Sequence, residues 1–114
     1  MIEQLKKYSF VEAVIQFGSS LTRKDYRDID ICVFTSKKIS LKQKLTVVNT
    51  LPEKLDVSFY DDLPLNVKQE VFRGKILFCK DRLKLLQEQQ RVNDEMVSYS
   101  CFLNNYHRER MKAL

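Results

Sequence analysis

The sequence contains few of the residues that characterise several common kinds of protein. Its 114 residues include two glycines, two prolines and no tryptophan, which excludes collagen-like, linker-like and low-complexity chains. One histidine and three widely spaced cysteines without a Cys-x-x-Cys pair cannot complete a zinc cluster. No stretch reads as a membrane span, and the N-terminus MIEQLKKYSF lacks the long apolar region of a secretory signal. We therefore expect a cytoplasmic protein with reduced thiols and no membrane association.

The composition is that of one folded domain with a mild positive charge. Hydrophobic residues make up 44% of the chain and charged residues 31%, so a core can form within a single domain spanning residues 1–114. The 20 lysines and arginines exceed the 15 acids, which gives a net charge of +5 at pH 7. This excess is spread evenly, so it suits an anionic ligand but provides no distinct stripe for nucleic-acid binding.

Apolar residues recur with two different periods, which predicts alternating strands and helices. We expect an α+β fold with a sheet of four strands, helices mainly on one face of that sheet, and a long C-terminal helix. The expected strands cover residues 11–17, 28–34, 54–60 and 75–80, and the expected helices cover residues 2–8, 40–51, 64–73 and 82–113.

Several residues mark where these helices begin or end. Ser40, with Gln43 three residues later, is typical of a capping box. Gly74 is expected to follow the third helix as its C′ residue. Asp61 and Asp62 are expected to cap the start of that same helix.

A polar turn follows the first strand and contains Gly18, Ser19 and Ser20. Glycine lets the backbone approach a ligand closely, and serine hydroxyls with exposed N–H groups can hold an anion. Arg23 and Lys24, in the same loop, offer cations to a phosphate, although a solvated basic loop would contain the same residues. A turn of this composition is common, so by itself it does not decide the function.

Three aspartates add a more specific signal. Asp28 and Asp30 share one face of their strand because successive side chains point to opposite faces. If the next strand pairs beside it, Asp56 can stand next to Asp30. Clustered carboxylates repel one another unless a cation binds, and Mg²⁺ prefers such oxygen ligands. The pattern predicts metal-assisted phosphoryl transfer with two Mg²⁺ ions, whereas a solvated strand edge is the alternative.

These motifs together resemble the polymerase-β-type nucleotidyltransferase superfamily. Within it, the small size and the run LPLNVKQEVFRGKILFCKD resemble the minimal nucleotidyltransferases, called MNT proteins, over a core of about residues 10–82. The resemblance implies a mixed strand order, with Asp28, Asp30 and Asp56 as catalytic metal ligands. It also implies that Gly18 and Ser19 bind the nucleotide phosphates, to which we add Ser20 and Arg23. Eight residues separate Ser19 from Asp28, where many members have roughly ten and a second glycine.

The resemblance also suggests an activity and a partner. Family members transfer a nucleoside monophosphate, often AMP from ATP, to an acceptor, and many minimal members act as antitoxins of a helical HEPN-type ribonuclease. The expected function is therefore Mg²⁺-dependent transfer of AMP to a hydroxyl of that partner. One alternative is a catalytically silent antitoxin that neutralises a helical partner by contact. Another is transfer to RNA or a small molecule, for which the chain has no additional acceptor-binding domain.

The C-terminal helical segment, residues 82–113, has a regular apolar stripe after its expected cap, Asp81. The stripe consists of Val92, Met96, Tyr99, Leu103 and Tyr106, with spacings of 4, 3, 4 and 3 residues. We expect its first half to cover the sheet. The last turns, which include Tyr99, Phe102 and Tyr106, would extend beyond a domain of this size and suit a partner helix in a homo- or hetero-oligomer.

Overall fold

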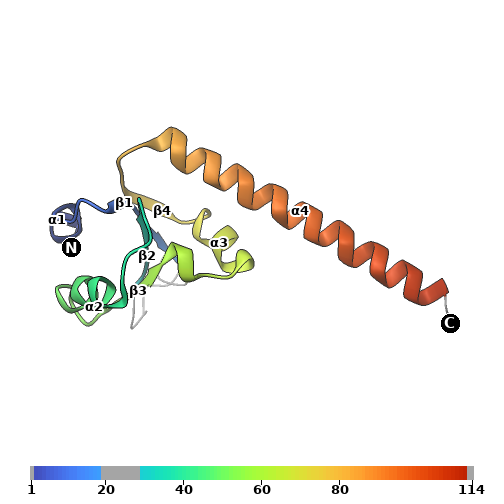
Figure 1. Ribbon diagram of the computed structural model, residues 1–114, viewed down its shortest axis with the longest axis horizontal. Coiled ribbons are helices and arrows are strands. Elements are labelled where there is room, and N and C mark those ends of the chain that lie inside the picture. Colours follow the sequence, from blue (N-terminus) through green and yellow to red (C-terminus); the bar gives the residue numbers. More distant parts are fainter. Residues whose placement is uncertain (1, 19–28, 113–114) are drawn as a thin grey trace.

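The structure is a mixed four-stranded sheet with helices packed against it (Figure 1). The computed structural model describes residues 2–18 and 29–112, and their side chains as far as residue 104. The strand order is β3-β2-β1-β4, in which β1 is antiparallel to both of its neighbours and β2 is parallel to β3. The strands are β1 (Val11–Phe17), β2 (Ile29–Thr35), β3 (Leu55–Phe59) and β4 (Lys75–Cys79).

The helices occupy the segments expected from the sequence, within a few residues at each end. A one-turn 3-10 helix between β3 and α3 was not expected, and it ends the third strand at Phe59 rather than at Tyr60. The helices are α1 (Ile2–Lys6), α2 (Leu41–Asn49), η2 (Tyr60–Asp62), α3 (Leu65–Val71) and α4 (Arg82–Lys112).

Both faces of the sheet are covered, so the expectation of helices mainly on one face was wrong. Leu5 of α1 and Val47 of α2 belong to the core cluster on one face, whereas Val71 of α3 and Val92 of α4 belong to the cluster on the other. The reason lies in β2, where all four residues from 31 to 34 are buried. A strand that is apolar on both sides needs cover on both sides.

Helix α2 begins at the predicted capping box. The hydroxyl of Ser40 accepts a hydrogen bond from the backbone N–H of Gln43, and the Gln43 side chain accepts one from the backbone N–H of Ser40. Asp81 likewise accepts a hydrogen bond from the N–H of Lys84 at the start of α4, at 3.3 Å. These contacts satisfy N–H groups that have no partner within the helix.

Two of the expected helix boundaries were wrong in detail. The N-cap of α3 is Pro64, whose ring cannot form a hydrogen bond, and Asp62 accepts a hydrogen bond from Nζ of Lys44, at 2.7 Å, instead of capping the helix. Gly74 is not a left-handed C′ residue, because Gly18 is the only described residue with positive φ. Gly74 instead lies against β1, where an added Cβ would be 2.2 Å from the carbonyl oxygen of Gln16.

Helix α4 continues well past the rest of the molecule (Figure 1). It has 31 residues, but among its described side chains none beyond Val92 belongs to either core cluster. The radius of gyration is 17.1 Å, compared with about 13 Å for a compact domain of this length. The helix therefore covers the sheet with its first three turns only. No described helix is both long and apolar enough to cross a membrane.

Candidate active site

Gly18 and Asp30 face each other across the β1–β2 pair. Phe17 is the register partner of Asp30, so the chain leaves β1 beside this aspartate. Gly18 has a φ of +82°, a backbone conformation that residues other than glycine rarely adopt. A Cβ atom at this position would lie 2.5 Å from Oδ2 of Asp30. Glycine is therefore required here both for the turn and for the position of the carboxylate.

Asp56 lies beside Asp30 in the sheet. The two residues are register partners in the parallel pair of β2 and β3, so their side chains leave the same face. Asp30 is half-buried and Asp56 is exposed, so solvent and ligands can reach the pair. The sequence predicts Asp56 beside Asp30 if these two strands pair, and the observed pairing places them so. Alternation alone could not show that the strands are neighbours.

The other predicted site residues lie outside the part of the chain that the structure describes. They include the third aspartate, Asp28, the two serines of the turn, and the loop cations, namely Ser19, Ser20, Arg23 and Lys24. Within residues 2–18 and 29–104, no three His, Cys, Asp or Glu side chains are placed to hold a metal ion. The described part of the candidate site is therefore Gly18 with the adjacent carboxylates of Asp30 and Asp56.

The chemistry of this donor set fits a hard divalent cation. Asp30 and Asp56, which are paired across two neighbouring strands, provide carboxylate oxygens. Mg²⁺ prefers oxygen ligands over nitrogen or sulfur. Cys32 shares their face of β2 but is fully buried, and burial raises the pKa of its thiol well above the ordinary range. Cys32 is therefore a core residue, and its sulfur is not one of the ligands of the candidate site.

Comparison with known proteins is consistent with this geometry. The family model for polymerase beta nucleotidyltransferases matches residues 1–83, which is most of the chain and includes every residue of the candidate site. The chain belongs to the polymerase beta nucleotidyltransferase family. No curated protein sequence matches it.

Several solved structures share the fold at low sequence identity. A mutant of the toxin–antitoxin pair MntA–HpeT matches with a TM-score of 0.63 and 15% identity, over 97% of this chain and 92% of that one. The tri-AMPylated Shewanella oneidensis HEPN toxin in complex with MNT antitoxin matches with a TM-score of 0.58 and 18% identity, over 97% and 89%. A toxin–antitoxin structure with AMP-PNP matches with a TM-score of 0.58 and 19% identity, over 97% and 92%.

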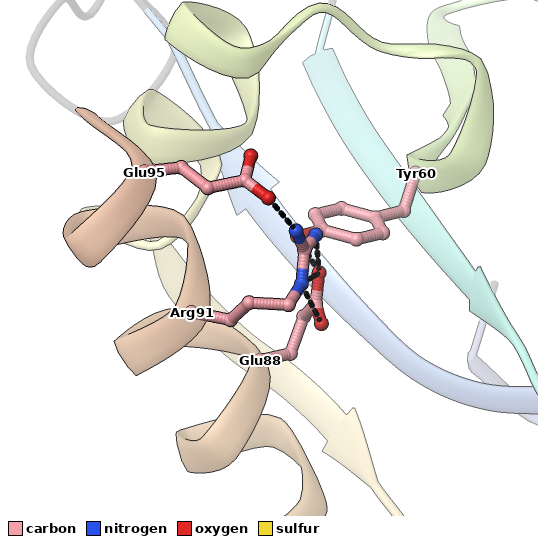
Figure 2. Close-up of polar contacts among 4 residues, drawn as sticks. All are labelled: Tyr60, Glu88, Arg91 and Glu95. Atoms are coloured by element: carbon pink, nitrogen blue, oxygen red, sulfur yellow. Dashed lines mark hydrogen bonds and ion pairs between the residues drawn. The ribbon is translucent and has the colours of Figure 1, made fainter. Parts of the chain in front are cut away.

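This nucleotidyltransferase domain has a second polar cluster, which sequence reasoning missed. The hydroxyl of Tyr60 donates a hydrogen bond to Oε1 of Glu88 at 2.7 Å, and Arg91 forms ion pairs with both Glu88 and Glu95 (Figure 2). Glu88, Arg91 and Glu95 are three and four residues apart, a spacing that brings side chains together on one face of a helix. The contact with Tyr60 is not predictable from that spacing, because it depends on where α4 crosses the sheet.

The pKa values in this cluster are shifted by the contacts just described. The hydrogen bond from Arg91 lowers the pKa of the Glu88 carboxyl, and the hydrogen bond from Tyr60 lowers it further, against the opposing effect of burial. Burial raises the pKa of the Tyr60 phenol, and the hydrogen bond to Glu88 raises it again. Tyr60 therefore remains a neutral donor, and Glu88 remains a charged acceptor, through the physiological pH range.

A cavity of about 390 Å³ lies beside this cluster, at the opposite end of β2 from Asp30. Phe34 and Tyr60, whose rings stack with centroids 4.3 Å apart, form one wall. Tyr60 has the same parity as Asp56 in the sequence, but it lies beyond the far end of β3, away from the aspartate pair. The cavity is therefore separate from the described part of the candidate active site.

Proposed function

We propose that this chain is a Mg²⁺-dependent nucleotidyltransferase that transfers AMP from ATP to a hydroxyl of a protein partner. The observation that carries the proposal is the placement of Asp30 between Gly18 and Asp56, because it brings two carboxylates to a turn with positive φ at the end of β1. Membership of the family supports the type of reaction. The AMP-PNP structure among the similar folds supports a nucleoside triphosphate as the donor.

The site residues form two groups in the proposed reaction, one for the metal ions and one for the phosphates. Asp30 and Asp56, with Asp28, would hold two Mg²⁺ ions, which when bound offset the charge of the triphosphate. Gly18, with Ser19, Ser20 and Arg23, would hold the outer phosphates close to the backbone of the turn. Because Asp56 is the exposed member of the pair, it is accessible to an acceptor hydroxyl and would take its proton.

The transfer forms one bond and breaks another. The acceptor oxygen attacks the α-phosphorus of ATP, and the bond from that phosphorus to the oxygen bridging to the β-phosphate breaks. Pyrophosphate leaves with the bonding electron pair, while the acceptor proton passes to the carboxylate of Asp56. The product is an acceptor that carries AMP through a phosphodiester bond.

We further propose that the acceptor is a helical HEPN-type toxin and that the chain is its antitoxin. This proposal is based on the similar fold of the Shewanella oneidensis complex, in which a tri-AMPylated HEPN toxin is bound by MNT antitoxin. The protein would act in the cytoplasm, where Cys32, Cys79 and Cys101, which are not paired with one another in the structure, would stay reduced.

A transfer assay tests the proposal directly. The chain is incubated with α-labelled ATP, Mg²⁺ and the product of the adjacent reading frame, and label on that product is measured. We expect Asp30→Asn to abolish labelling, whereas Glu53→Gln, an exposed acid before β3, serves as the matched control and keeps it. Absence of label with the unmodified chain, under conditions in which ATP binds, would reject the enzymatic proposal.

A second candidate function is neutralisation of the partner by contact alone. The observation that favours it is the exposed apolar surface on the part of α4 that lies beyond the sheet. The variant with Asp28, Asp30 and Asp56 all changed to Asn separates the two functions. Neutralisation of the toxin by this variant in cells would indicate contact, and loss of neutralisation would indicate catalysis.

A further inference from the structure

The projecting part of α4 has an unusual surface for a helix in water. From Met96 to His107 the sequence contains no Asp, Glu, Lys or Arg, although such residues make up 31% of the chain. Tyr99 is 55% exposed and Phe102 is 65% exposed. Depletion of charge together with exposed aromatic residues is the composition of the centre of a protein interface.

Four of the larger apolar residues of this segment lie on one side of the helix, whereas Val97, which is 64% exposed, lies on the other. At 100° per residue, Met96, Tyr99, Phe102 and Leu103 fall within an arc of about 120°. The arc continues the line of Leu85 and Val92, which α4 buries against its own sheet. Leu85, Val92 and Tyr99 are seven residues apart, so the same face of α4 first packs on the domain and then extends beyond it.

The width of this arc indicates what kind of partner covers it. A two-helix coiled coil buries a narrow seam of two positions per heptad, whereas a helix seated in a groove between two helices buries an arc of 100° or more. Phe102 widens the arc beyond the seam formed by Met96, Tyr99 and Leu103. A bundle of helices therefore fits this surface better than a single α4 helix from a second copy.

The length of chain that the similar solved structures match supports the same partner. The nucleotidyltransferase family model ends at residue 83, one residue after α4 begins. The toxin–antitoxin structures instead match 97% of the chain, so they also retain a counterpart of the projecting helix. A helix that lies beyond the family model but is matched in the toxin–antitoxin structures is explained by a role in the pairing.

We propose that the arc of Met96, Tyr99, Phe102 and Leu103 docks into a groove between two helices of the partner toxin. This inference rests on the proposed function for the identity of the partner. Leu85 and Val92 pack α4 against the sheet, and the hydrogen bond of Tyr60 to Glu88 joins the helix to the end of β3, while the ion pairs of Arg91 with Glu88 and Glu95 lie within α4 (Figure 2). The docking surface is thereby held at a set distance and orientation from Asp30 and Asp56.

The test uses the full chain and the product of the adjacent reading frame. Tyr99→Glu and Phe102→Glu each place a charge in the arc, and Asn104→Glu places the same charge on the opposite side of the helix as a matched control. We expect the two arc variants to weaken the complex at least 30-fold by calorimetry, and the control to bind as the unmodified chain does. All three should keep the unmodified melting temperature and ATP binding, because this segment lies outside both core clusters.

The possible outcomes separate this inference from the proposed function. Retention of the complex by both arc variants overturns the docking surface, whether or not label transfer occurs. A complex that forms through the arc but transfers no label supports the docking surface and rejects the enzyme. The choice of partner is overturned if the product of the adjacent reading frame does not bind the unmodified chain. It is also overturned if the unmodified chain dimerises through the arc.

Discussion

The carboxylate of Asp30 occupies the space that a side chain at Gly18 would need. The ideal Cβ position of Gly18 lies 2.5 Å from Oδ2 of Asp30, and the φ of +82° disfavours any L side chain there. The turn after β1 and the side chain of Asp30 therefore depend on each other. Glycine at position 18 is explained by the proximity of the Asp30 carboxylate as well as by the turn.

Gly18→Ala should therefore damage the site more than the fold. The atom that the new methyl group meets is the end of the Asp30 side chain, which can rotate away without moving the backbone. The left-handed conformation adds a cost of about 1 kcal/mol. We expect AMP transfer to fall at least tenfold while the melting temperature drops by only a few degrees, measured by the label assay and by circular dichroism. Full activity would show that the position of Asp30 does not matter.

Gly74→Ala should damage the fold more than the site, the opposite of Gly18→Ala. Its added methyl group would lie 2.2 Å from the backbone oxygen of Gln16 in β1, and a backbone carbonyl in a sheet cannot rotate away. Overpacking of this kind costs about 1–3 kcal/mol. We expect a clear loss in the free energy of unfolding by urea titration, with unchanged transfer per folded molecule. An unaltered urea midpoint would contradict the close packing of α3 and β4 on β1.

Asp56→Asn tests the second carboxylate at nearly constant shape. The amide keeps the volume of the side chain but removes the negative charge next to Asp30, so we expect transfer to fall at least about 100-fold. Stability should be unchanged or slightly higher, because two adjacent like charges no longer repel each other. Differential scanning fluorimetry with AMP-PNP and Mg²⁺ should show a shift for the unmodified chain and none for the variant. A shift of equal size in both would remove Asp56 from the site.

Much of this fold could be predicted from the sequence because its strands alternate cleanly and end at turn residues. The residues from 11 to 17 form a strand as expected, with Gly18 at its end, and the capping box at Ser40 begins α2. Alternation within each strand also showed that Asp30 and Asp56 can share a face if the two strands pair. Their adjacency required the strand order, which came from the family resemblance and which periodicity alone cannot supply.

The remaining features depend on contacts between distant segments, which local patterns do not specify. Asp62 was expected to cap α3, but Lys44, 18 residues earlier, is close enough to bind it. Helices on both faces follow from the burial of Cys32 and Phe34, which the sequence marks only as two more apolar residues. The position of Tyr60 against α4 likewise depends on the path of a helix that begins 22 residues later.

Glu88 should make the stability of the chain sensitive to acid. Its pKa in the folded protein is lowered, first by the hydrogen bond from Arg91 and then by that from Tyr60, relative to a value of about 4.3 in an unfolded chain. A lowered folded pKa contributes stability that is fully present above the unfolded value and is lost as the pH falls through the folded one. Glu88→Gln lacks this contribution at every pH. We therefore expect the variant to melt below the unmodified chain at pH 7, and the gap to narrow as the pH falls below about 4.3.

Tyr60→Phe separates the hydrogen bond from the packing of the ring in the same cluster. The ring that stacks on Phe34 is kept, but the donor to Glu88 is lost, so we expect a loss of about 1 kcal/mol in the free energy of unfolding at pH 7. Arg91 still binds Glu88 in this variant, so acid sensitivity should persist, in contrast to Glu88→Gln. Thermal melts of the three proteins between pH 7 and pH 3.5 check both expectations. A gap between Glu88→Gln and the unmodified chain that stays constant across this range would show that the contacts of Glu88 in the folded protein do not lower its pKa.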